Sequence, residues 1–369
     1  MNKRIYLDYN STSPVRETLW SDLSKLPVEN PSSTHLAGKK ALKEVHSVTQ
    51  FLFQTFGISS NEHSIFYHSG ASEGLNTIFQ LAHKDAFFYF ETDHPCIHAI
   101  AKNLRVKNVE CFCLGVKEDG LPDLDLVIQK INSIKAKNKW INFTYLNNES
   151  GIITPIKNIL KIKNATNINV HIDAVQIVGK APNVELSPLV DAYTFSGHKF
   201  GALKGIGFSF YKSNLKLNAL ILGGGQQNGL RGGTLNTHGI YSLKLALNNR
   251  DFEKEYQMIK SLKDEAVEII NAYDDLIYIE NSSSNTIYFL HKNLKSDVLL
   301  VYFDMNGIDV SSGSACSSGS VEKSRVLEAM GYTDLAKNNI RISFGIENYF
   351  EKDLILEKLK KVLALICKK

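Results

Sequence analysis

Two charged side chains and one thiol in this sequence are of types that could carry out covalent chemistry together. Lys199 and Asp173 each follow a short apolar run, and 26 positions separate them. A lysine amine can bond to the aldehyde of pyridoxal phosphate (PLP), and a carboxylate can hold a proton on the pyridine nitrogen of that cofactor. Cys316 lies in a run of serine and glycine, where a deprotonated thiol would be an accessible nucleophile.

Each of these residues also has an ordinary interpretation. Asp173 could cap a helix, Lys199 could be a solvated surface lysine, and Cys316 could be a loop residue without a role. In an open α/β sheet, however, ligands bind at the carboxyl ends of the strands. Because Asp173 and Lys199 both follow predicted strands, we favour a shared cofactor site over separate structural roles.

Small and polar residues near these positions suit a phosphate group. Residues 70–72 (Gly-Ala-Ser) open a predicted helix, where backbone N–H groups and the helix dipole favour an anion. Ser196 and His198 precede Lys199 closely and could contact the same phosphate. The sequence contains neither a Walker motif nor a GxGxxG motif after its first strand, which argues against a nucleotide cofactor.

The elements that would position these residues follow from the hydrophobic pattern. Short apolar runs alternate with helical patterns up to about residue 210, which predicts an α/β fold with a mainly parallel sheet covered on both faces. We expect helices at 33–56 and 351–365, and one long helical region from about 236 to 273. The expected strands lie at 65–67, 86–90, 109–114, 140–146, 169–172, 193–195 and 207–211.

The order of these elements predicts two domains. We expect a large cofactor-binding domain at 15–255 and a smaller α+β domain made of residues 1–14 and 256–369. Cys316 would then come from the small domain and approach a cofactor held by the large one.

Composition excludes several other classes of protein. Lys plus Arg (42) barely exceeds Asp plus Glu (38), so the net charge of +4 does not favour direct nucleic-acid binding. No apolar run is long enough to span a bilayer, and no signal-like segment follows the N-terminus, so we expect a cytoplasmic protein. Five cysteines without a CxxC pair, and histidines without metal-ligand spacing, predict free thiols and no catalytic metal.

A series of motifs in a fixed order identifies a family resemblance. The chain resembles the NifS/IscS-type cysteine desulfurases, which are class V aminotransferase-like PLP enzymes of fold type I. The motifs are YLDYNSTSP (6–14), NPSSTHLAGKKA (30–41), HSGASEG (68–74), NNESGIITPI (147–156), HIDAVQIVGK (171–180), SGHK (196–199), KGIG (204–207), GGGQQNGLRGGTLN (223–236), GIDVSSGSACSSGS (307–320) and IRISFG (340–345).

The resemblance implies a fold and an activity. It implies a mainly parallel seven-stranded sheet flanked by helices, with a smaller α+β domain. It also implies conversion of L-cysteine to L-alanine, with the sulfur passed to a persulfide on Cys316. A sulfur-acceptor protein would follow, either a scaffold for iron–sulfur cluster assembly or a relay for tRNA thiolation. The alternatives are a selenocysteine lyase or an aminotransferase on the same fold, and a degenerate binding subunit, which the intact set of site residues disfavours.

The resemblance also implies roles for individual residues around the cofactor. Lys199 would hold PLP and move protons, Asp173 would pair with the pyridine nitrogen, and His94 would stack on the ring and assist acid–base steps. Gln176 would donate to the phenolic oxygen of the ring. The phosphate would be held by Ala71, Ser72, Ser196 and His198, and by Thr234 of the second subunit of a homodimer.

Substrate recognition is assigned in the same way. Asn148 would contact the cofactor and, together with Arg341, hold the substrate carboxylate, while Asn10 would lie near the substrate entrance. A guanidinium fork suits a planar carboxylate, although Arg341 could also be an ordinary surface arginine on a strand. The family commonly has Thr at the position of Ser72, and the hydroxyl is kept. Bacterial IscS members carry a longer tail that docks the scaffold, whereas 28 residues follow Arg341 here, which leaves such docking open.

Overall fold

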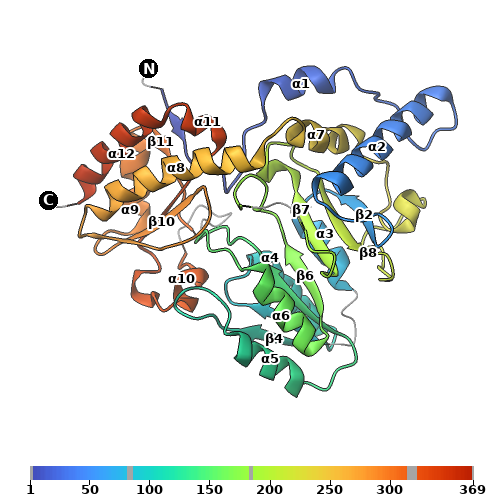
Figure 1. Ribbon diagram of the computed structural model, residues 1–369, viewed down its shortest axis with the longest axis horizontal. Coiled ribbons are helices and arrows are strands. Elements are labelled where there is room, and N and C mark those ends of the chain that lie inside the picture. Colours follow the sequence, from blue (N-terminus) through green and yellow to red (C-terminus); the bar gives the residue numbers. More distant parts are fainter. Residues whose placement is uncertain (1–2, 81–85, 183–185, 314–321, 368–369) are drawn as a thin grey trace.

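A seven-stranded sheet with the strand order β2-β8-β7-β6-β5-β3-β4 forms the centre of the fold (Figure 1). The computed structural model describes residues 3–80, 86–182, 186–313 and 322–367. Strands β3 to β7 pair in parallel, and β8 runs antiparallel to both β2 and β7. The predicted mainly parallel seven-stranded sheet is confirmed. Its strands are β2 (His63–His68), β3 (Ala86–Phe90), β4 (Glu110–Leu114), β5 (Lys139–Thr144), β6 (Asn169–Asp173), β7 (Ala192–Ser196) and β8 (Gly207–Lys212).

Helices cover both faces of this sheet, which is why its strands are apolar on both sides. In β3, Phe88 and Phe90 belong to one buried cluster, whereas Phe87 and Tyr89 belong to another on the opposite face. The first cluster includes residues of α1 (Glu17–Leu23), α2 (Leu36–Thr55), α5 (Leu124–Ser133), α6 (Ile156–Thr166) and α7 (Thr237–Leu247). The second includes residues of α3 (Ala71–Phe79) and α4 (Pro95–Val106).

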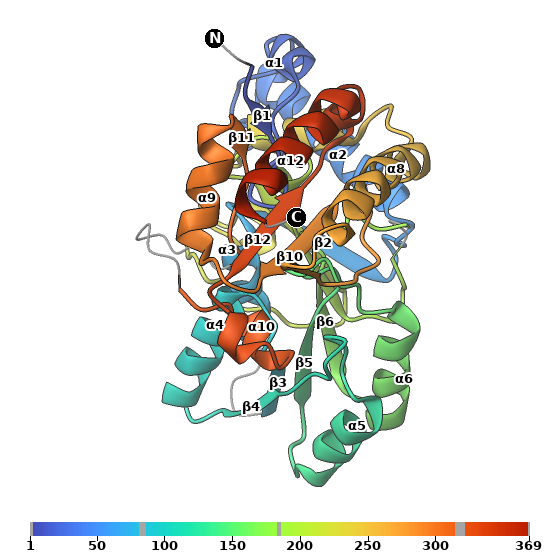
Figure 2. The same ribbon diagram turned by 90° about the vertical axis from the view of Figure 1, so that its left-hand side faces the viewer.

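A smaller unit with its own core packs beside the sheet (Figure 2). Strands β9 (Leu276–Tyr278), β10 (Thr286–His291) and β12 (Asn339–Ser343) form an antiparallel sheet, and β1 (Ile5–Tyr6) pairs in parallel with β11 (Ile308–Asp309). Helices α8 (Phe252–Asn271), α9 (Ser296–Met305) and α12 (Lys352–Ile366) surround these strands. The shorter helices are α10 (Arg325–Ala329), α11 (Ile346–Tyr349), and the 3-10 turns Gly197–Lys199, Gln226–Gly229 and Thr333–Leu335.

The N-terminal strand belongs to the smaller unit. Ile5 and Leu7 lie in the same buried cluster as Ile259, Phe289 and Ile342. This clustering supports our proposal of a small domain formed by residues 1–14 and 256–369 and a large domain formed by residues 15–255.

The region from 236 to 273 is not the single long helix that the sequence predicts. Helix α7 ends at Leu247 and α8 begins at Phe252. Between them Asn249 has a φ of 56°, a left-handed conformation that interrupts the helix. Asp251 then caps α8 by accepting a hydrogen bond from the Lys254 N–H at 3.0 Å. Polar residues such as these also fit the exposed side of a helix, so the hydrophobic pattern does not reveal the break.

Other expected elements lie close to their predicted positions. The strand at 86–90 is β3, and the expected C-terminal helix at 351–365 is α12, displaced by one residue.

Among the described residues, no helix has both the length and the apolar character to cross a membrane. Cys316 belongs to the segment 314–321, which lies outside the described residues.

Candidate active site

The carboxyl ends of β5, β6 and β7 meet at one edge of the sheet, and a cavity of about 570 Å³ opens there. We call it the strand-end cavity. Most of the predicted site residues line it, namely Ala71, Ser72, His94, Asn148, Asp173, Gln176, Ser196, His198 and Lys199. Because these residues come from segments up to 128 positions apart, the parallel strand order is what gathers them.

Lys199 ends the 3-10 turn that follows β7, and its amine points at the N-terminal segment. Its Nζ donates to the backbone oxygens of Asn10 at 2.8 Å and Ser11 at 2.7 Å. Burial, and to a lesser extent the nearby positive charge of Arg341, lower the pKa of Lys199 from 10.5 to about 8. An amine with such a pKa is neutral, and therefore nucleophilic, far more often near neutral pH than an ordinary lysine.

Asp173 ends β6 and is 7% exposed. Its Oδ1 accepts a hydrogen bond from the Val175 N–H at 3.0 Å, and no donor of the described residues reaches its other oxygen. Burial, and to a lesser extent the charge of the neighbouring Asp93, raise the pKa of Asp173 to about 6. A cationic N–H placed against the free oxygen would relieve this cost, since a nearby positive charge favours the carboxylate.

Two histidines at the cavity are held in their neutral form. His94 caps α4 by accepting from the Cys96 N–H at 3.1 Å through Nδ1, so its other ring nitrogen carries the proton. Burial and the charge of Lys199 lower the pKa of His94 to about 4. The same two causes lower the pKa of His198 to about 4, and its Nδ1 lies 3.1 Å from the Thr12 hydroxyl.

The opposite end of the cavity suits an anion. Ala71 and Ser72 form the first turn of the nine-residue helix α3, where backbone N–H groups lack helical partners and the helix dipole is positive. Lys204, from the KGIG motif, is exposed at the same rim and adds a positive charge. Cys96 also lines the cavity, but burial raises the pKa of its thiol, which keeps it protonated and a poor nucleophile.

Gln176 is oriented by a buried lysine that the sequence analysis did not single out. Lys180 is 5% exposed, and its Nζ donates to Gln176 Oε1 at 2.5 Å and to the Tyr9 backbone oxygen at 3.1 Å. Since Oε1 faces Lys180, the amide nitrogen of Gln176 faces the other way and donates to the Asn10 backbone oxygen at 2.9 Å. Burial, together with the positive charge of Lys199, lowers the pKa of Lys180 well below its usual value.

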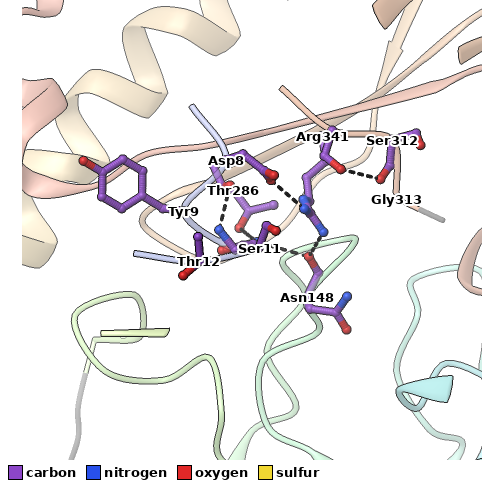
Figure 3. Close-up of polar contacts among 12 residues, drawn as sticks. Asp8, Tyr9, Ser11, Thr12, Asn148, Thr286, Ser312, Gly313 and Arg341 are labelled. Atoms are coloured by element: carbon purple, nitrogen blue, oxygen red, sulfur yellow. Dashed lines mark hydrogen bonds and ion pairs between the residues drawn. The ribbon is translucent and has the colours of Figure 1, made fainter. Parts of the chain in front are cut away.

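Arg341 lies on β12, and its guanidinium contacts both the N-terminal segment and the loop that follows β5 (Figure 3). Its Nη2 forms an ion pair with Asp8 at 2.7 Å, and its Nη1 donates to the Asn148 backbone oxygen at 3.0 Å. Its Nε is buried and has no hydrogen-bond partner among the described residues. The guanidinium is thus oriented by Asp8 and retains donors for a further ligand. Sequence reasoning missed Asp8, although it lies within the quoted YLDYNSTSP motif.

A second cavity of about 290 Å³ adjoins the first and contains Arg341 in its wall. Lys199, His94 and Asn148 line both cavities, so the two cavities adjoin at these residues. Gly313 and Glu322, which flank the segment carrying Cys316, line the second cavity. The described residues on both sides of that segment therefore line the same cavity as Lys199.

Asn10 accepts a hydrogen bond from Lys199, and its side chain also links different parts of the fold. It is 1% exposed, and its Nδ2 donates to the Asn148 backbone oxygen at 3.1 Å and to Thr286 Oγ1 at 2.9 Å. Its Oδ1 accepts from Asn285 Nδ2 at 3.0 Å. These contacts join the N-terminal segment to both units of the fold.

Thr234 lies apart from the other predicted residues. It is exposed on the loop before α7 and does not line the strand-end cavity of its own chain. An exposed residue at this position can contact another subunit, whereas it does not reach the strand-end cavity of its own chain.

A separate cluster in the smaller unit brings together Asp275, His291 and Cys367. Nδ1 of His291 accepts from the Asn293 and Leu294 N–H groups, each at 3.0 Å, so Nε2 carries the proton and donates to the Ile366 backbone oxygen at 3.0 Å. Both ring nitrogens are thus used within the protein. The arrangement suits a structural histidine better than a metal ligand.

Comparison with known proteins identifies the family. Residues 5–353 match the model of the aminotransferase class-V family. The chain is 30% identical to the cysteine desulfurase IscS of Dictyoglomus turgidum, over 98% of this chain and 97% of that protein. It superimposes on a NifS-like protein of Rickettsia africae with a TM-score of 0.87 at 27% identity, covering 97% and 99% of the two chains. A solved structure described as SspA in complex with cysteine gives a TM-score of 0.77 at 27% identity, covering 92% and 99%.

Enzymes of this family use pyridoxal phosphate, and the residues present fit that cofactor. The strand-end cavity offers a lysine amine of lowered pKa, a buried carboxylate with one free oxygen, and a helix N-terminus for a phosphate. The chain belongs to the aminotransferase class-V family and, within it, to the cysteine desulfurases of the IscS and NifS type.

Proposed function

We propose that this enzyme converts L-cysteine to L-alanine and transfers the sulfur to Cys316. In the overall step the C–S bond of cysteine and the S–H bond of Cys316 break, while an S–S bond to Cys316 and a C–H bond on the β-carbon of alanine form. The hydrogens balance, and no external oxidant or reductant is needed. The observation that carries this proposal is the second cavity, which Lys199 and Arg341 line together with Gly313 and Glu322, the described residues that flank the Cys316 segment.

Three side chains have the properties that this reaction needs. Arg341, oriented by Asp8, is suited to bind the substrate carboxylate through its remaining N–H groups. Lys199 is suited to anchor the cofactor and to carry the α-proton, because its amine alternates readily between neutral and charged forms near pH 8. Asp173 would hold a proton on the pyridine nitrogen. When bound, pyridoxal phosphate withdraws electrons from the substrate carbon.

The other predicted residues support binding and proton transfer. Ala71, Ser72, Ser196 and His198 are suited to hold the phosphate, and neutral His94 can stack on an aromatic ring and accept or donate a proton. Asn148 lines both cavities, which supports a contact to cofactor and substrate.

The test compares two thiols near the same cavity. Cys316→Ser is expected to keep the cofactor but to lose formation of alanine and of a labelled persulfide from isotopically labelled cysteine. Cys96→Ser is the matched control, because the raised pKa of that thiol makes it a poor nucleophile and its removal should leave turnover intact. Normal alanine formation by Cys316→Ser would refute the proposal and favour a lyase that needs no acceptor thiol. Lys199→Ala should in addition lose the yellow colour of the bound cofactor.

We propose a homodimer in which Thr234 completes the phosphate site of the second subunit. Its exposed position, and the neighbouring exposed side chains Leu220, Ile221 and Leu222, support a subunit contact on this face. Mixing Thr234→Ala with Lys199→Ala subunits tests this arrangement. If Thr234 serves the other subunit, the mixed dimer places both changes at one site and leaves the other intact, so about half of the wild-type activity per mixed dimer is expected.

We further propose that the sulfur passes to an acceptor protein, a scaffold for iron–sulfur cluster assembly or a relay for tRNA thiolation, in the cytoplasm. The free thiols Cys96, Cys111, Cys113 and Cys367 support a reducing compartment. Mass spectrometry of proteins that receive labelled sulfur from the wild-type enzyme, with Cys316→Ser as the control, tests the acceptor.

A further inference from the structure

The buried carboxyl group of Glu149 lies between the smaller unit and the loop after β5, the loop whose residue Asn148 lines both cavities. Glu149 is 8% exposed, directly after Asn148 in the loop that follows β5. Asn147 fixes the backbone of this loop, since its Oδ1 accepts from the Glu149 N–H at 3.0 Å and the Ser150 N–H at 2.9 Å. A buried carboxyl is costly unless its hydrogen bonds are satisfied, so its partners indicate what it orders.

One partner comes from the chain that follows the Cys316 segment. Glu149 Oε2 accepts from Ser324 Oγ at 2.6 Å, and Ser324 is fully buried. The Ser324 hydroxyl in turn caps α10 by accepting from the Leu327 N–H at 3.2 Å. The carboxylate therefore fixes the chain two residues after Glu322, where the described residues resume.

The chain that precedes the segment contacts the same carboxylate through Gly313. Tyr288, on β10, also donates to Glu149 Oε2, at 3.4 Å, and Gly313 packs against both the Tyr288 hydroxyl and the carboxylate. A Cβ on Gly313 would lie 2.5 Å from Glu149 Oε2 and 2.2 Å from the Tyr288 hydroxyl, so only glycine allows this approach. The Gly313 N–H donates to Asn339 Oδ1 at 2.8 Å, which holds the chain in this place.

The same loop also supports the proposed substrate-binding residue. Asn148 accepts from Arg341 through its backbone oxygen, one residue before Glu149. Tyr288 and Arg341 are direct partners in the β10–β12 ladder. A displacement of the carboxylate would therefore move Gly313 and Ser324, the described residues on either side of the Cys316 segment, relative to Arg341.

We propose that Glu149 is a positioning residue for sulfur transfer: its carboxylate accepts a hydrogen bond from Ser324, after the Cys316 segment, and packs against Gly313, before it, and so ties these flanking residues to the loop that supports Arg341. This inference rests on the proposed function, in which Cys316 accepts the sulfur. Glu149 exchanges no atom or electron in that step. Its effect is on the distance and orientation at which the thiolate meets the substrate sulfur, where an error of 1 Å can cost a large factor in rate.

The experiment separates binding from transfer in the holoenzyme. The variants are Glu149→Ala, Glu149→Gln and Gly313→Ala. Ser242→Ala is the control, because Ser242 is as fully buried as Ser324 but forms hydrogen bonds only to backbone groups of the large sheet unit. The measurements are cofactor content, the cysteine Kd from the change in cofactor absorbance, and the single-turnover rate of persulfide formation on Cys316.

For Glu149→Ala we expect unchanged cofactor content, a cysteine Kd within about threefold of wild type, and a persulfide rate lowered by at least about tenfold. Glu149→Gln should recover most of the rate, because its amide oxygen can still accept from Ser324. Gly313→Ala should reproduce the loss from the other chain end, and it decides the matter if Glu149→Ala does not fold. Ser242→Ala should match wild type.

A wild-type persulfide rate in Glu149→Ala or in Gly313→Ala would overturn the inference. So would an equal loss of cofactor or of cysteine binding, since that would make Glu149 a general structural residue. If wild-type enzyme itself formed no persulfide on Cys316, the proposed function would fail instead, and the two failures are thereby distinguishable.

Discussion

The lowered pKa of Lys199 makes a quantitative prediction about how fast the apoprotein takes up its cofactor. Only the neutral amine can attack an aldehyde. At pH 7, lowering a lysine pKa from 10.5 to about 8 multiplies its neutral fraction by about 300. The rate of cofactor attachment is therefore expected to rise with pH and to level off above about pH 8, rather than continuing to rise to pH 10.

The assay follows the absorbance of the bound cofactor after mixing apoprotein with pyridoxal phosphate at a series of pH values. Nα-acetyl-lysine serves as the reference, because the cofactor's own ionisations affect both reactions equally and cancel in the ratio of the two rates. Lys199→Ala reports any uptake without covalent attachment.

A variant tests the cause of the shift. Arg341→Gln removes a positive charge that lowers the pKa of Lys199, and it frees Asp8, whose negative charge raises that pKa. Both changes favour the ammonium form, so the midpoint should move above that of the wild type. A wild-type midpoint at pH 10 or higher would refute the reasoning, because it would mean that burial does not disfavour the charged amine in this cavity. An unmoved midpoint in Arg341→Gln would refute the assigned role of the arginine.

Further expectations concern the cofactor's carboxylate partner and the packing of the N-terminal segment within the smaller unit. Asp173→Asn should keep the cofactor but lower kcat by at least about 100-fold, since a neutral amide cannot hold a proton on the pyridine nitrogen; a kcat within about threefold of wild type would contradict this. Gly345→Ala should destabilise the protein by about 1–3 kcal/mol in urea unfolding. The reason is that the new Cβ would lie 1.9 Å from the ring of Tyr9, whereas Gly115→Ala, which meets no atom within 4 Å, should be neutral.

The site illustrates how one N-terminal segment joins two units. The backbone oxygens of residues 9–11 accept hydrogen bonds from Lys180, Gln176 and Lys199 of the large unit. Asp8 and the side chain of Asn10 bind Arg341 and Thr286 of the smaller unit. A shift between the units would therefore act directly on the lysine amine and on the arginine that faces it.

Much of the fold could be predicted because the relevant signals are local. The strands of the large sheet are short apolar runs, since both faces are buried, and the helices between them show amphipathic spacing. The break at Asn249 was missed because a left-handed residue in a polar turn leaves the hydrophobic spacing of its neighbours unchanged.

The sequence by itself determined the strand-end positions of Asp173 and Lys199, the small residues that open α3, and the family to which the motifs belong. Only the tertiary structure determined which charged side chains pair with one another. Asp8 and Arg341 are 333 positions apart, and nothing in either segment specifies the other. The burial that lowers the pKa of Lys199 and Lys180, and the closeness of Gly313 to Glu149, likewise arise when distant segments exclude water together. Local spacing cannot encode these properties, because burial and electrostatic coupling depend on contacts made across the whole chain.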